Sequence, residues 1–522
     1  MSDDRLTVRD ATFALLRELG ITTIFGNPGS TELPLFRAFP DDFRYIVGLQ
    51  ESVVVGMADG FAQATRNAAF VNVHASAGLG HALGNVFTAF RNQTPLVITA
   101  GQQARSILPY EPFLYAQQAT EFPRPFVKWA IEPARAEDVP AALARAYYVA
   151  MQPPCGPVFV SVPVDDWDRP AEPIAARRIG TVIRGDVEVL SAAAQALTQA
   201  RHPALVVGAG VARDQAWDEA IRLAEHHRAR VFVSPMSGRN SFPEDHPLFA
   251  GFLTAGRGPI VRDLAGHDVI VALGGPLSLY HTEAAGPHTP AGSAVFLLVD
   301  DPALAHWAPA GTATVTNLKS GIADLLAFSG EVSRRAPTPK APPPVLDGTE
   351  FTDSYLLQQI ARLRPAGAVI VEEAPSSRPT MHDYLPITIP DGFYTCASGG
   401  LGHGLPAAIG VALARPDARV IAYIGDGSAM YAIQGLWTAA QLGLPMTFVV
   451  ANNRRYEAMY HFAGVFEMEA PIGCTLPGID FCAIAQGHGV PATRVTAASE
   501  LDAALTSAFA STGPSLVEVV IA

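Results

Sequence analysis

The residues with the clearest chemical potential follow two strand-like runs in the last third of the chain. The run VIAYIG is followed directly by Asp426, Gly427 and Ser428, and the run MTFVVAN ends on Asn452 and Asn453. Neighbouring parallel strands present their carboxyl ends at one edge of a sheet, so we expect a carboxylate and a carboxamide to meet there. Such oxygen ligands suit a hard divalent cation such as Mg²⁺, which commonly keeps phosphate oxygens as further ligands.

An ordinary strand-to-helix turn is the alternative, because Gly-Asp-Gly alone is common in such turns. Here the glycines permit close backbone approach, and the following helix N-terminus favours an anion. The Asn pair, which ends 27 residues after Asp426, adds the second ligand group. Together they favour a site for a metal ion and a diphosphate.

This pairing resembles the motif of thiamine diphosphate enzymes, and the chain is most similar to the benzoylformate decarboxylases. The likeness covers nearly the whole chain and includes FGNPGSTELP, PLVITAGQQ, FPRPFVKW and IGDGSA. It implies thiamine diphosphate held through Mg²⁺ or Ca²⁺, with Asp426, Asn453 and the carbonyl of Arg455 as metal ligands. The residues implied to contact the cofactor are Glu51, Ser376, Gly399, Leu401, Gly425, Gly427, Ser428, Asn453 and Tyr456.

Four residues have catalytic roles only through this resemblance. By itself Glu51 is a favourable charge at a helix start; the resemblance implies that it hydrogen-bonds N1' of the aminopyrimidine and promotes its imino tautomer. His74 and His281 alone are typical of structural histidines, yet they align with two catalytic histidines that move protons. His74 is implied in addition and protonation, and His281 in later proton transfer and product release. By itself Ser30 is typical of a turn serine or a helix N-cap, which the following Thr31 and Glu32 also fit; the resemblance implies that it binds the substrate carboxylate.

The substrate pocket implied by the family contains Ser30, Phe113, Leu114, Met459 and Phe462, which suit an aromatic side chain. The chain departs from the family pattern near this pocket, and these departures could shift preference toward another 2-oxo acid. Where relatives have a small uncharged stretch, this chain has Arg454, Arg455, Glu457 and Tyr460. Pro375 replaces a hydroxyl residue beside Ser376, and His81 replaces an amide residue.

The elements that must position these residues alternate between apolar runs and helix-period segments, which predicts an α/β fold of three doubly wound domains with parallel sheets. The expected elements include a strand over 45–49 and a helix over 429–442. The proposed domains are residues 1–178 (pyrimidine-binding), 183–332 (central) and 350–522 (diphosphate-binding), with a proline-rich linker over 333–349. The central domain has Gly208 and Gly210 after a strand but no third glycine, which is weak evidence for a nucleotide.

Composition narrows the class of protein. The 522 residues contain 36 Lys and Arg against 49 Asp and Glu, and a net charge of −13 argues against nucleic acid or membrane partners. Four cysteines without metal-like spacing, and no signal-peptide segment in MSDDRLTVRD, favour the cytoplasm. Two charge-free windows, 67–90 and 392–414, are long enough to span a bilayer. Their polar and glycine residues instead predict folded, buried chain. Because the first contains His74 and the second contains Gly399 and Leu401, the resemblance implies that both windows wall the cofactor and the decarboxylation pocket.

We therefore expect non-oxidative decarboxylation of an aromatic 2-oxo acid, first of all benzoylformate to benzaldehyde and CO₂, as in mandelate catabolism. The alternatives are a carboligase similar to acetolactate synthase, a decarboxylase of another 2-oxo acid, and a cofactor-binding protein without catalysis. Glu51, His74 and His281 together disfavour the last. The family also implies a homodimer or homotetramer with the cofactor at the subunit interface.

Overall fold

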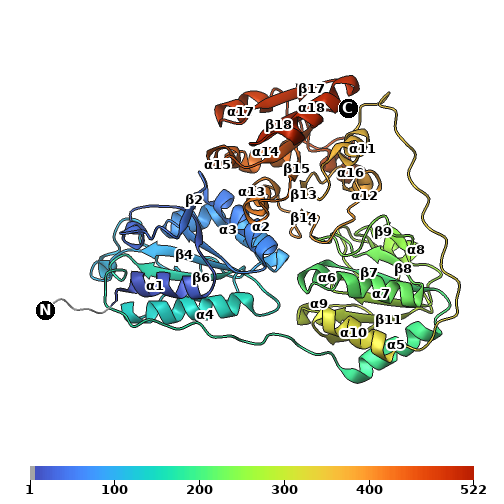
Figure 1. Ribbon diagram of the computed structural model, residues 1–522, viewed down its shortest axis with the longest axis horizontal. Helices are drawn as coiled ribbons and strands as arrows, with labels where there is room; N and C mark the ends of the chain where they lie inside the picture. The colour runs from blue at the N-terminus through green and yellow to red at the C-terminus, as the bar shows by residue number, and fades with distance from the viewer. Residues whose placement is uncertain (1–5, 522) are drawn as a thin grey trace. The chain divides into compact units, whose positions relative to one another are not determined.

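Three six-stranded sheets organise the computed structural model, which describes residues 6–521 (Figure 1). All strand pairs with a recorded register are parallel, and helices flank the sheets, so the predicted α/β fold is confirmed. The chain forms two compact units. The first contains the described residues up to Gly180, Leu363–Ser376 and those from Ser398 onward; the second contains Thr181–Arg362 and Ser377–Ala397.

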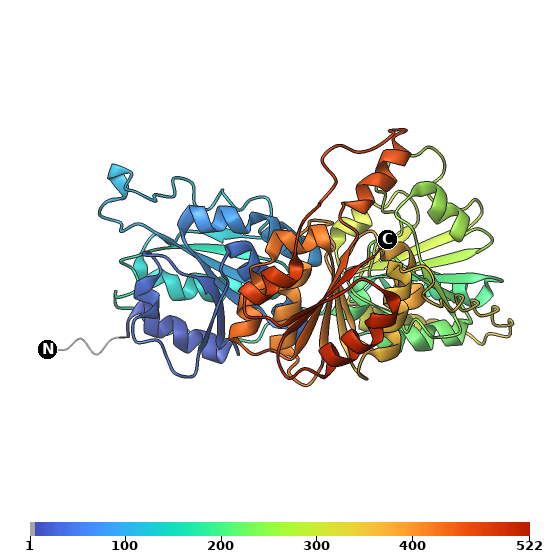
Figure 2. The same ribbon diagram turned by 90° about the horizontal axis from the view of Figure 1, so that it is seen from above.

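The first sheet has the strand order β2-β1-β3-β4-β6-β5. Its strands are β1 (Thr23–Asn27), β2 (Arg44–Val47), β3 (Ala69–Val73), β4 (Leu96–Gln102), β5 (Ala130–Ile131) and β6 (Val158–Pro163). Helices α1 (Val8–Glu18) and α4 (Val139–Met151) share the core of one face, and α2 (Glu51–Thr65) and α3 (Ala75–Asn92) pack together on the other (Figure 2). β3 and β4 are buried throughout because helices cover both faces. The strand predicted over 45–49 ends at Val47, because the chain leaves the sheet to reach the N-cap of α2.

The third sheet has the order β14-β13-β15-β16-β18-β17. Its strands are β13 (Val369–Glu373), β14 (Phe393–Thr395), β15 (Val420–Gly425), β16 (Met446–Asn452), β17 (Ala492–Val495) and β18 (Ser515–Val520). The helices of this region are α11 (Asp353–Leu363), α12 (Arg378–Tyr384), α13 (Gly404–Ala414), α14 (Asp426–Ala432), α15 (Gly435–Gln441), α16 (Glu457–Val465), α17 (Phe481–Gly487) and α18 (Ala498–Ala510).

The single helix predicted over 429–442 is wrong, because α14 and α15 divide this segment. The first ends at Ala432 and the second begins at Gly435. A Cβ on Gly435 would lie 2.6 Å from Cδ2 of Leu405 and 3.2 Å from Cδ1 of Ile409. The break therefore lets α13 pack closely against the start of α15, which periodicity along one segment does not reveal.

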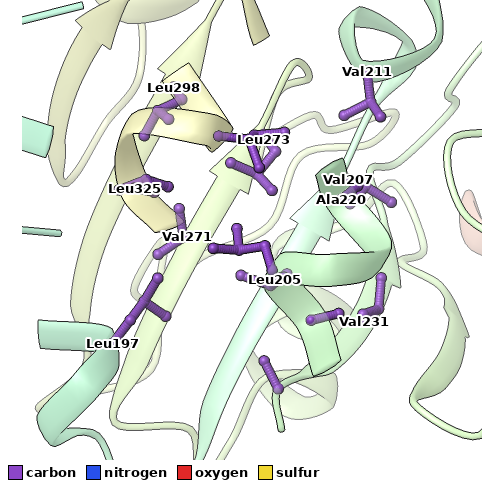
Figure 3. Close-up of a cluster of buried hydrophobic side chains, with 14 of the residues drawn as sticks. Leu197, Leu205, Val207, Val211, Ala220, Val231, Val271, Leu273, Leu298 and Leu325 are labelled. Carbon is purple, nitrogen blue, oxygen red and sulfur yellow. The ribbon is translucent and has the colours of Figure 1, made fainter. Parts of the chain in front are cut away.

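The second unit is built on the sheet β12-β11-β10-β7-β8-β9. Its strands are β7 (Pro203–Val207), β8 (Arg230–Val233), β9 (Phe249–Phe252), β10 (Val269–Leu273), β11 (Ala294–Val299) and β12 (Thr312–Val315). Leu205 and Leu273 of its central strands meet Leu197 of α5 (Val187–Gln199), Ala220 of α7 (Trp217–His227) and Leu325 of α10 (Leu318–Phe328) in one apolar core (Figure 3).

Neither charge-free window forms a spanning segment in the described chain. The first contributes β3 and most of α3, and the second contains β14 and α13. Across residues 6–521, no helix combines the length and the apolar character needed to cross a membrane. The segment over 333–349, which was predicted to be a linker, has neither helix nor strand.

Helices α2 and α13, neighbours in Figure 1, cross in backbone contact. A Cβ on Gly60 would overlap the carbonyl of Ala407, and one on Gly410 would overlap the carbonyl of Met57. A Cβ on Gly56 would stand 2.6 Å from Cγ of Pro406. Only glycine permits this approach, so the crossing fixes the two helices to each other without an intervening side-chain layer.

Replacing Gly60 with Ala is expected to destabilise the first unit by about 1–3 kcal/mol, because the added methyl group meets rigid backbone. Gly84 of α3 is the matched control, since a Cβ there would meet nothing within 4 Å. Its replacement by Ala should be neutral or stabilising by up to about 1 kcal/mol. Thermal unfolding of the two purified variants checks the pair; equal melting temperatures would contradict the proposed contact.

Candidate active site

The carboxyl ends of β2, β1 and β3 gather three predicted residues at one edge of the first sheet. β1 pairs with both other strands, with Gly26 opposite Val47 and Asn27 opposite Val73. Glu51 follows β2, Ser30 follows β1 and His74 follows β3. This edge is the usual ligand-binding edge of a parallel sheet. We call these three residues the N-terminal half-site.

Glu51 is the first residue of α2, and it is buried although it carries a carboxylate. The side chain of Gln50 caps the helix by accepting hydrogen bonds from the backbone N–H groups of Ser52 (2.7 Å) and Val53 (3.2 Å). Glu51 is therefore not needed as a cap, and its Oε2 lies 3.2 Å from Nδ1 of His81. The histidine flagged as a departure from the family thus contacts the predicted catalytic carboxylate.

His74 is the N-cap residue of α3, and its ring is 21% exposed. Its Nδ1 lies 2.7 Å from Oε2 of Glu32 and 3.2 Å from Oγ1 of Thr31. The backbone of Gly29 lies against the ring, where any Cβ would overlap it. The turn that carries Ser30 therefore packs on His74 and holds both residues at the same edge.

The carboxyl ends of β15 and β16 form a second group, which we call the C-terminal half-site: Asp426, Asn453 and Arg455. Gly425 is paired with Ala451, so the two strand ends lie side by side as predicted. Asp426 is only 4% exposed, and its Oδ1 accepts from the N–H of Gly427 at 2.7 Å. Burial raises the pKa of this carboxyl group, and the N–H of Gly427 partly opposes the shift.

The donor set of this half-site fits a divalent cation. Oδ2 of Asp426 is buried and has no hydrogen-bond partner among the described residues. A buried carboxylate oxygen without a partner is costly unless a cation is bound to it. Oδ1 of Asn453 accepts from the N–H of Arg455 at 3.1 Å, which tightens the turn that carries both predicted ligands.

Glycines shape the rest of this region for a ligand that approaches the backbone. Gly427 lies against the ring of Tyr456, so that no Cβ could be accommodated. Gly399 has a φ of +73° and is exposed, while Leu401 and Ser376 are half-buried. The predicted cofactor contacts Gly425 and Ser428 lie at the junction of β15 and α14.

Buried Glu373 fixes the loop that carries Gly399 and Leu401. It ends β13 and accepts backbone hydrogen bonds from Gly402 (2.6 Å), His403 (2.7 Å) and Gly404. These N–H groups lie at and just before the start of α13, where a carboxylate is stabilising. Its burial raises the pKa of Glu373, and the N–H groups of Gly402 and Gly404 oppose this.

A buried ion pair, Asp59 and His403, joins α2 to the start of α13. Nε2 of His403 lies 2.6 Å from Oδ2 of Asp59, and neither side chain is exposed. Gln63 and Asn92 also donate to Asp59, at 3.0 and 2.8 Å. Burial opposes both charges, but their mutual attraction prevails: the pKa of His403 is raised and that of Asp59 is lowered. Sequence reasoning missed this pair.

Apart from Ser30, the predicted pocket residues lie on two segments of the first unit. Phe113, 87% exposed, and Leu114 belong to the loop between β4 and β5, while Met459 and Phe462 belong to α16. Two of the unexpected charged residues, Arg455 and Glu457, form an ion pair at the start of α16.

The guanidinium of Arg455 pairs with Glu457 and lies 4.9 Å from the ring centroid of Tyr460. The two opposite charges therefore compensate each other within this segment.

His281 belongs to the second unit, in the segment between β10 and β11. Its backbone N–H donates to the carbonyl of Ala255 at 3.0 Å. This contact lies within the second unit, and the catalytic role of His281 beside the half-sites stays a prediction. The structure adds one residue that sequence reasoning assigned only to a turn: Glu32, whose carboxylate contacts His74.

Three models of protein families match the chain: Thiamine pyrophosphate enzyme, N-terminal TPP binding domain, over residues 6–121; its central domain, over 190–325; and its C-terminal TPP binding domain, over 376–519. Among curated proteins, benzoylformate decarboxylase of Pseudomonas aeruginosa is 42% identical over 519 residues, which cover 98% of each chain. The acetolactate synthase large subunit of Haemophilus influenzae is 25% identical, over 95% of this chain and 90% of its own.

Solved structures agree with this pattern. Benzoylformate decarboxylase from Polynucleobacter necessarius superimposes with a TM-score of 0.96 at 40% identity, over 99% of this chain and 98% of its own. The thiamine diphosphate-dependent 4-hydroxybenzoylformate decarboxylase of Rhodococcus jostii RHA1 gives 0.96 at 38% identity, over 99% of both chains. The match is therefore of full length in sequence and in fold.

Proposed function

The chain belongs to the thiamine pyrophosphate (thiamine diphosphate) enzyme family, and from this membership we propose that it decarboxylates benzoylformate to benzaldehyde and CO₂. The observation that carries the proposal is the 42% identity to a benzoylformate decarboxylase over 98% of both chains. The reaction class is a carboxy-lyase acting on an aromatic 2-oxo acid. Each turnover releases CO₂ and takes up one proton.

The C-terminal half-site would hold the cofactor through Mg²⁺, with Ca²⁺ as a substitute. The proposed ligands are Asp426, whose buried Oδ2 has no other partner in the described chain, Asn453 and the carbonyl of Arg455. When bound, thiamine diphosphate supplies a thiazolium that accepts the electron pair released as CO₂ leaves. The residues proposed to contact its diphosphate and rings are Gly425, Gly427, Ser428, Tyr456, Ser376, Gly399, Leu401 and Glu51.

The proton chemistry is assigned to the N-terminal half-site. Glu51 would hold the proton at N1' of the aminopyrimidine, and Ser30 would donate a hydrogen bond to the substrate carboxylate. His74, at the same sheet edge, would give and take protons at the reacting carbonyl group. His281 would serve the later proton transfer and product release.

The pocket composition supports a substrate with an uncharged aromatic side chain. Apolar surface is offered by Phe113, Leu114, Met459 and Phe462. Such surface solvates the substrate carboxylate poorly and therefore favours its loss as CO₂. Because Arg455 is paired with Glu457, it does not offer an uncompensated charge that would select an acidic side chain. A 4-hydroxy substituent is the closest variant to consider, since a similar solved enzyme acts on 4-hydroxybenzoylformate.

A panel of 2-oxo acids, assayed with thiamine diphosphate and Mg²⁺, tests the substrate. We expect the highest kcat/KM for benzoylformate or its 4-hydroxy derivative, and benzaldehyde as the product. Preference for pyruvate, with acetolactate as product, would instead favour the second candidate, a transferase resembling the acetolactate synthases that match at lower identity. Preference for a long aliphatic acid would refute the substrate and leave the cofactor assignment standing.

Replacing Asp426 with Asn is expected to weaken Mg²⁺-dependent cofactor binding on the order of 100-fold, about 2.7 kcal/mol. The amide keeps the shape but removes the anionic oxygen that would face the metal. Titration calorimetry of the apo-enzyme with thiamine diphosphate and Mg²⁺ measures this loss, with exposed Asp417→Asn as the control. Without metal, the Asp426 variant should be at least as stable as the parent, because a buried carboxylate oxygen without a partner is removed. Unchanged affinity would refute the metal site.

The subunit arrangement is also proposed from the family. The cofactor would lie between the N-terminal half-site of one subunit and the C-terminal half-site of another, in a cytoplasmic homodimer or homotetramer that serves mandelate catabolism. Light scattering on the purified enzyme measures the assembly; a catalytically active monomer would contradict it.

A further inference from the structure

The catalytic proton shuttle proposed above, His74, contacts a carboxylate that has no part in binding metal or cofactor. Nδ1 of His74 lies 2.7 Å from Oε2 of Glu32, whose side chain is completely buried. The two residues come from adjacent strand ends, the turn after β1 and the end of β3. The ring is therefore held from the buried side, and 21% of the histidine side chain remains exposed.

Glu32 is fixed from three directions. Its Oε2 accepts from the N–H of Gly29 at 3.0 Å, and its Oε1 accepts from the N–H of Gly101 at 2.8 Å. The hydroxyl of Thr31 donates to Oε1 at 2.8 Å. Gly101 belongs to β4, so the carboxylate is tied to strands on both sides of β3. A residue held in this way cannot move without disturbing the sheet edge.

These contacts determine which nitrogen of His74 carries hydrogen. The carboxylate of Glu32 only accepts hydrogen bonds, and the single proton of the Thr31 hydroxyl is already donated to Glu32. Both neighbours of Nδ1 therefore present acceptor oxygens, so Nδ1 carries the hydrogen. The neutral ring then has its lone pair on Nε2, which has no hydrogen-bond partner among the described residues.

One group in contact with the Glu32 carboxylate can carry a positive charge. The recorded partners of its carboxylate include no lysine or arginine within residues 6–521, so the imidazole of His74 is the contacting group that can become cationic. Nearby Tyr45, whose pKa is raised by burial and then by the negative charge of Glu32, supplies no positive charge because a protonated phenol is neutral. A buried anion of this kind stabilises a positive charge formed on the ring beside it.

We propose that Glu32 is a positioning residue for His74: it holds the Nδ1–H tautomer, directs Nε2 toward the substrate, and stabilises the imidazolium that forms when Nε2 takes a proton. The proposal rests on the proposed function, in which His74 exchanges protons with the reacting group. Glu32 itself touches neither substrate nor cofactor. Its effect therefore falls on the proton-transfer step and leaves substrate and cofactor binding intact.

The first test uses the unmodified holoenzyme labelled with [¹⁵N]histidine. Nitrogen chemical shifts from magic-angle-spinning NMR distinguish the two tautomers, and His74→Gln identifies the signals by their loss. We expect hydrogen on Nδ1 of His74 in the neutral ring. Hydrogen on Nε2 would overturn the proposal, and this measurement does not depend on any Glu32 variant folding.

The second test compares kinetic constants of Glu32→Gln with those of Leu33→Ala, an exposed residue of the same turn. The amide can donate to Nδ1 and so favours the wrong tautomer. We expect kcat for benzoylformate to fall about 100-fold or more, KM and the dissociation constant of thiamine diphosphate to change less than about threefold, and Leu33→Ala to be near parental.

Three results distinguish failure of the inference from failure of the proposed function. If His74→Gln loses activity while Glu32→Gln keeps kcat within threefold, Glu32 is not a positioning residue and the assignment of His74 stands. If His74→Gln itself retains full turnover, the role of His74 in the proposed function fails, and the inference built on it fails too. Loss of cofactor binding in Glu32→Gln would show a structural role and overturn the proposal.

Discussion

Replacing Glu51 with Gln is expected to lower the turnover number for benzoylformate by about 10²- to 10⁴-fold when thiamine diphosphate and Mg²⁺ are saturating. The side chain is buried at the start of α2 and is not needed as a helix cap, because Gln50 already accepts from Ser52 and Val53. The amide retains the shape of the carboxylate but cannot hold a proton at N1' of the aminopyrimidine. Steady-state assays of benzaldehyde formation measure the loss.

A matched control separates catalysis from helix stability. Glu188 is an exposed glutamate in the first turn of α5, so Glu188→Gln removes a favourable charge from a helix N-terminus without touching the half-sites. We expect it to leave turnover unchanged. If Glu51→Gln also kept full turnover, with cofactor bound, Glu51 would be a structural helix-start charge and the mechanism would be wrong.

His403→Leu is expected to cost about 3–5 kcal/mol of stability, because it leaves Asp59 as a buried charge without its cationic partner. The pair is completely buried, with Nε2 of His403 2.6 Å from Oδ2 of Asp59. The double variant Asp59→Leu/His403→Leu should recover most of the loss, since both charges are removed together. Thermal unfolding of the apo-enzyme compares the three proteins; a double variant no more stable than His403→Leu would contradict this account.

The pair also predicts a pH dependence with a definite sign. The pKa of His403 is raised above its ordinary value of 6.5, so its contribution is complete below pH 6.5 and is lost as pH rises through the raised value. The pKa of Asp59 is lowered from 3.8, so its contribution is complete above pH 3.8 and is lost as pH falls through the lowered value. Melting temperatures measured from pH 4 to pH 9 should therefore show an alkaline decline that the double variant lacks.

Local patterns in the sequence predicted much of the fold and the metal half-site. Apolar runs that end on Asp426 and Asn452 predicted adjacent parallel strands, and the pairing of Gly425 with Ala451 confirms that adjacency. A single helix was predicted through Ile433, but the chain breaks there, and Gly435 at the start of the second helix packs closely on Leu405 of α13. Local periodicity does not reveal such packing.

The contacts that orient the site were beyond sequence reasoning for a related reason. Asp59 and His403 are 344 residues apart, and neither belongs to a motif that signals a partner. Glu32 lies two residues after Ser30 in a turn where a carboxylate also fits a local structural role, so its contact with His74 appears only once β1 and β3 are paired. Residue type and spacing indicated the reacting groups, whereas their supports depend on tertiary contacts.

The glycine-mediated crossing of α2 and α13 has a further consequence in the proposed assembly. Glu51 begins α2, and the loop with Gly399 and Leu401 precedes α13; with the cofactor between subunits, these two ends of the crossing serve different reaction centres. Two backbones in direct contact cannot compress as a side-chain layer can. Within one subunit, the start of α2 and the loop before α13 are therefore rigidly joined. The distance between these two ends would therefore be set by the fold of one subunit, whatever the assembly in which the subunits meet.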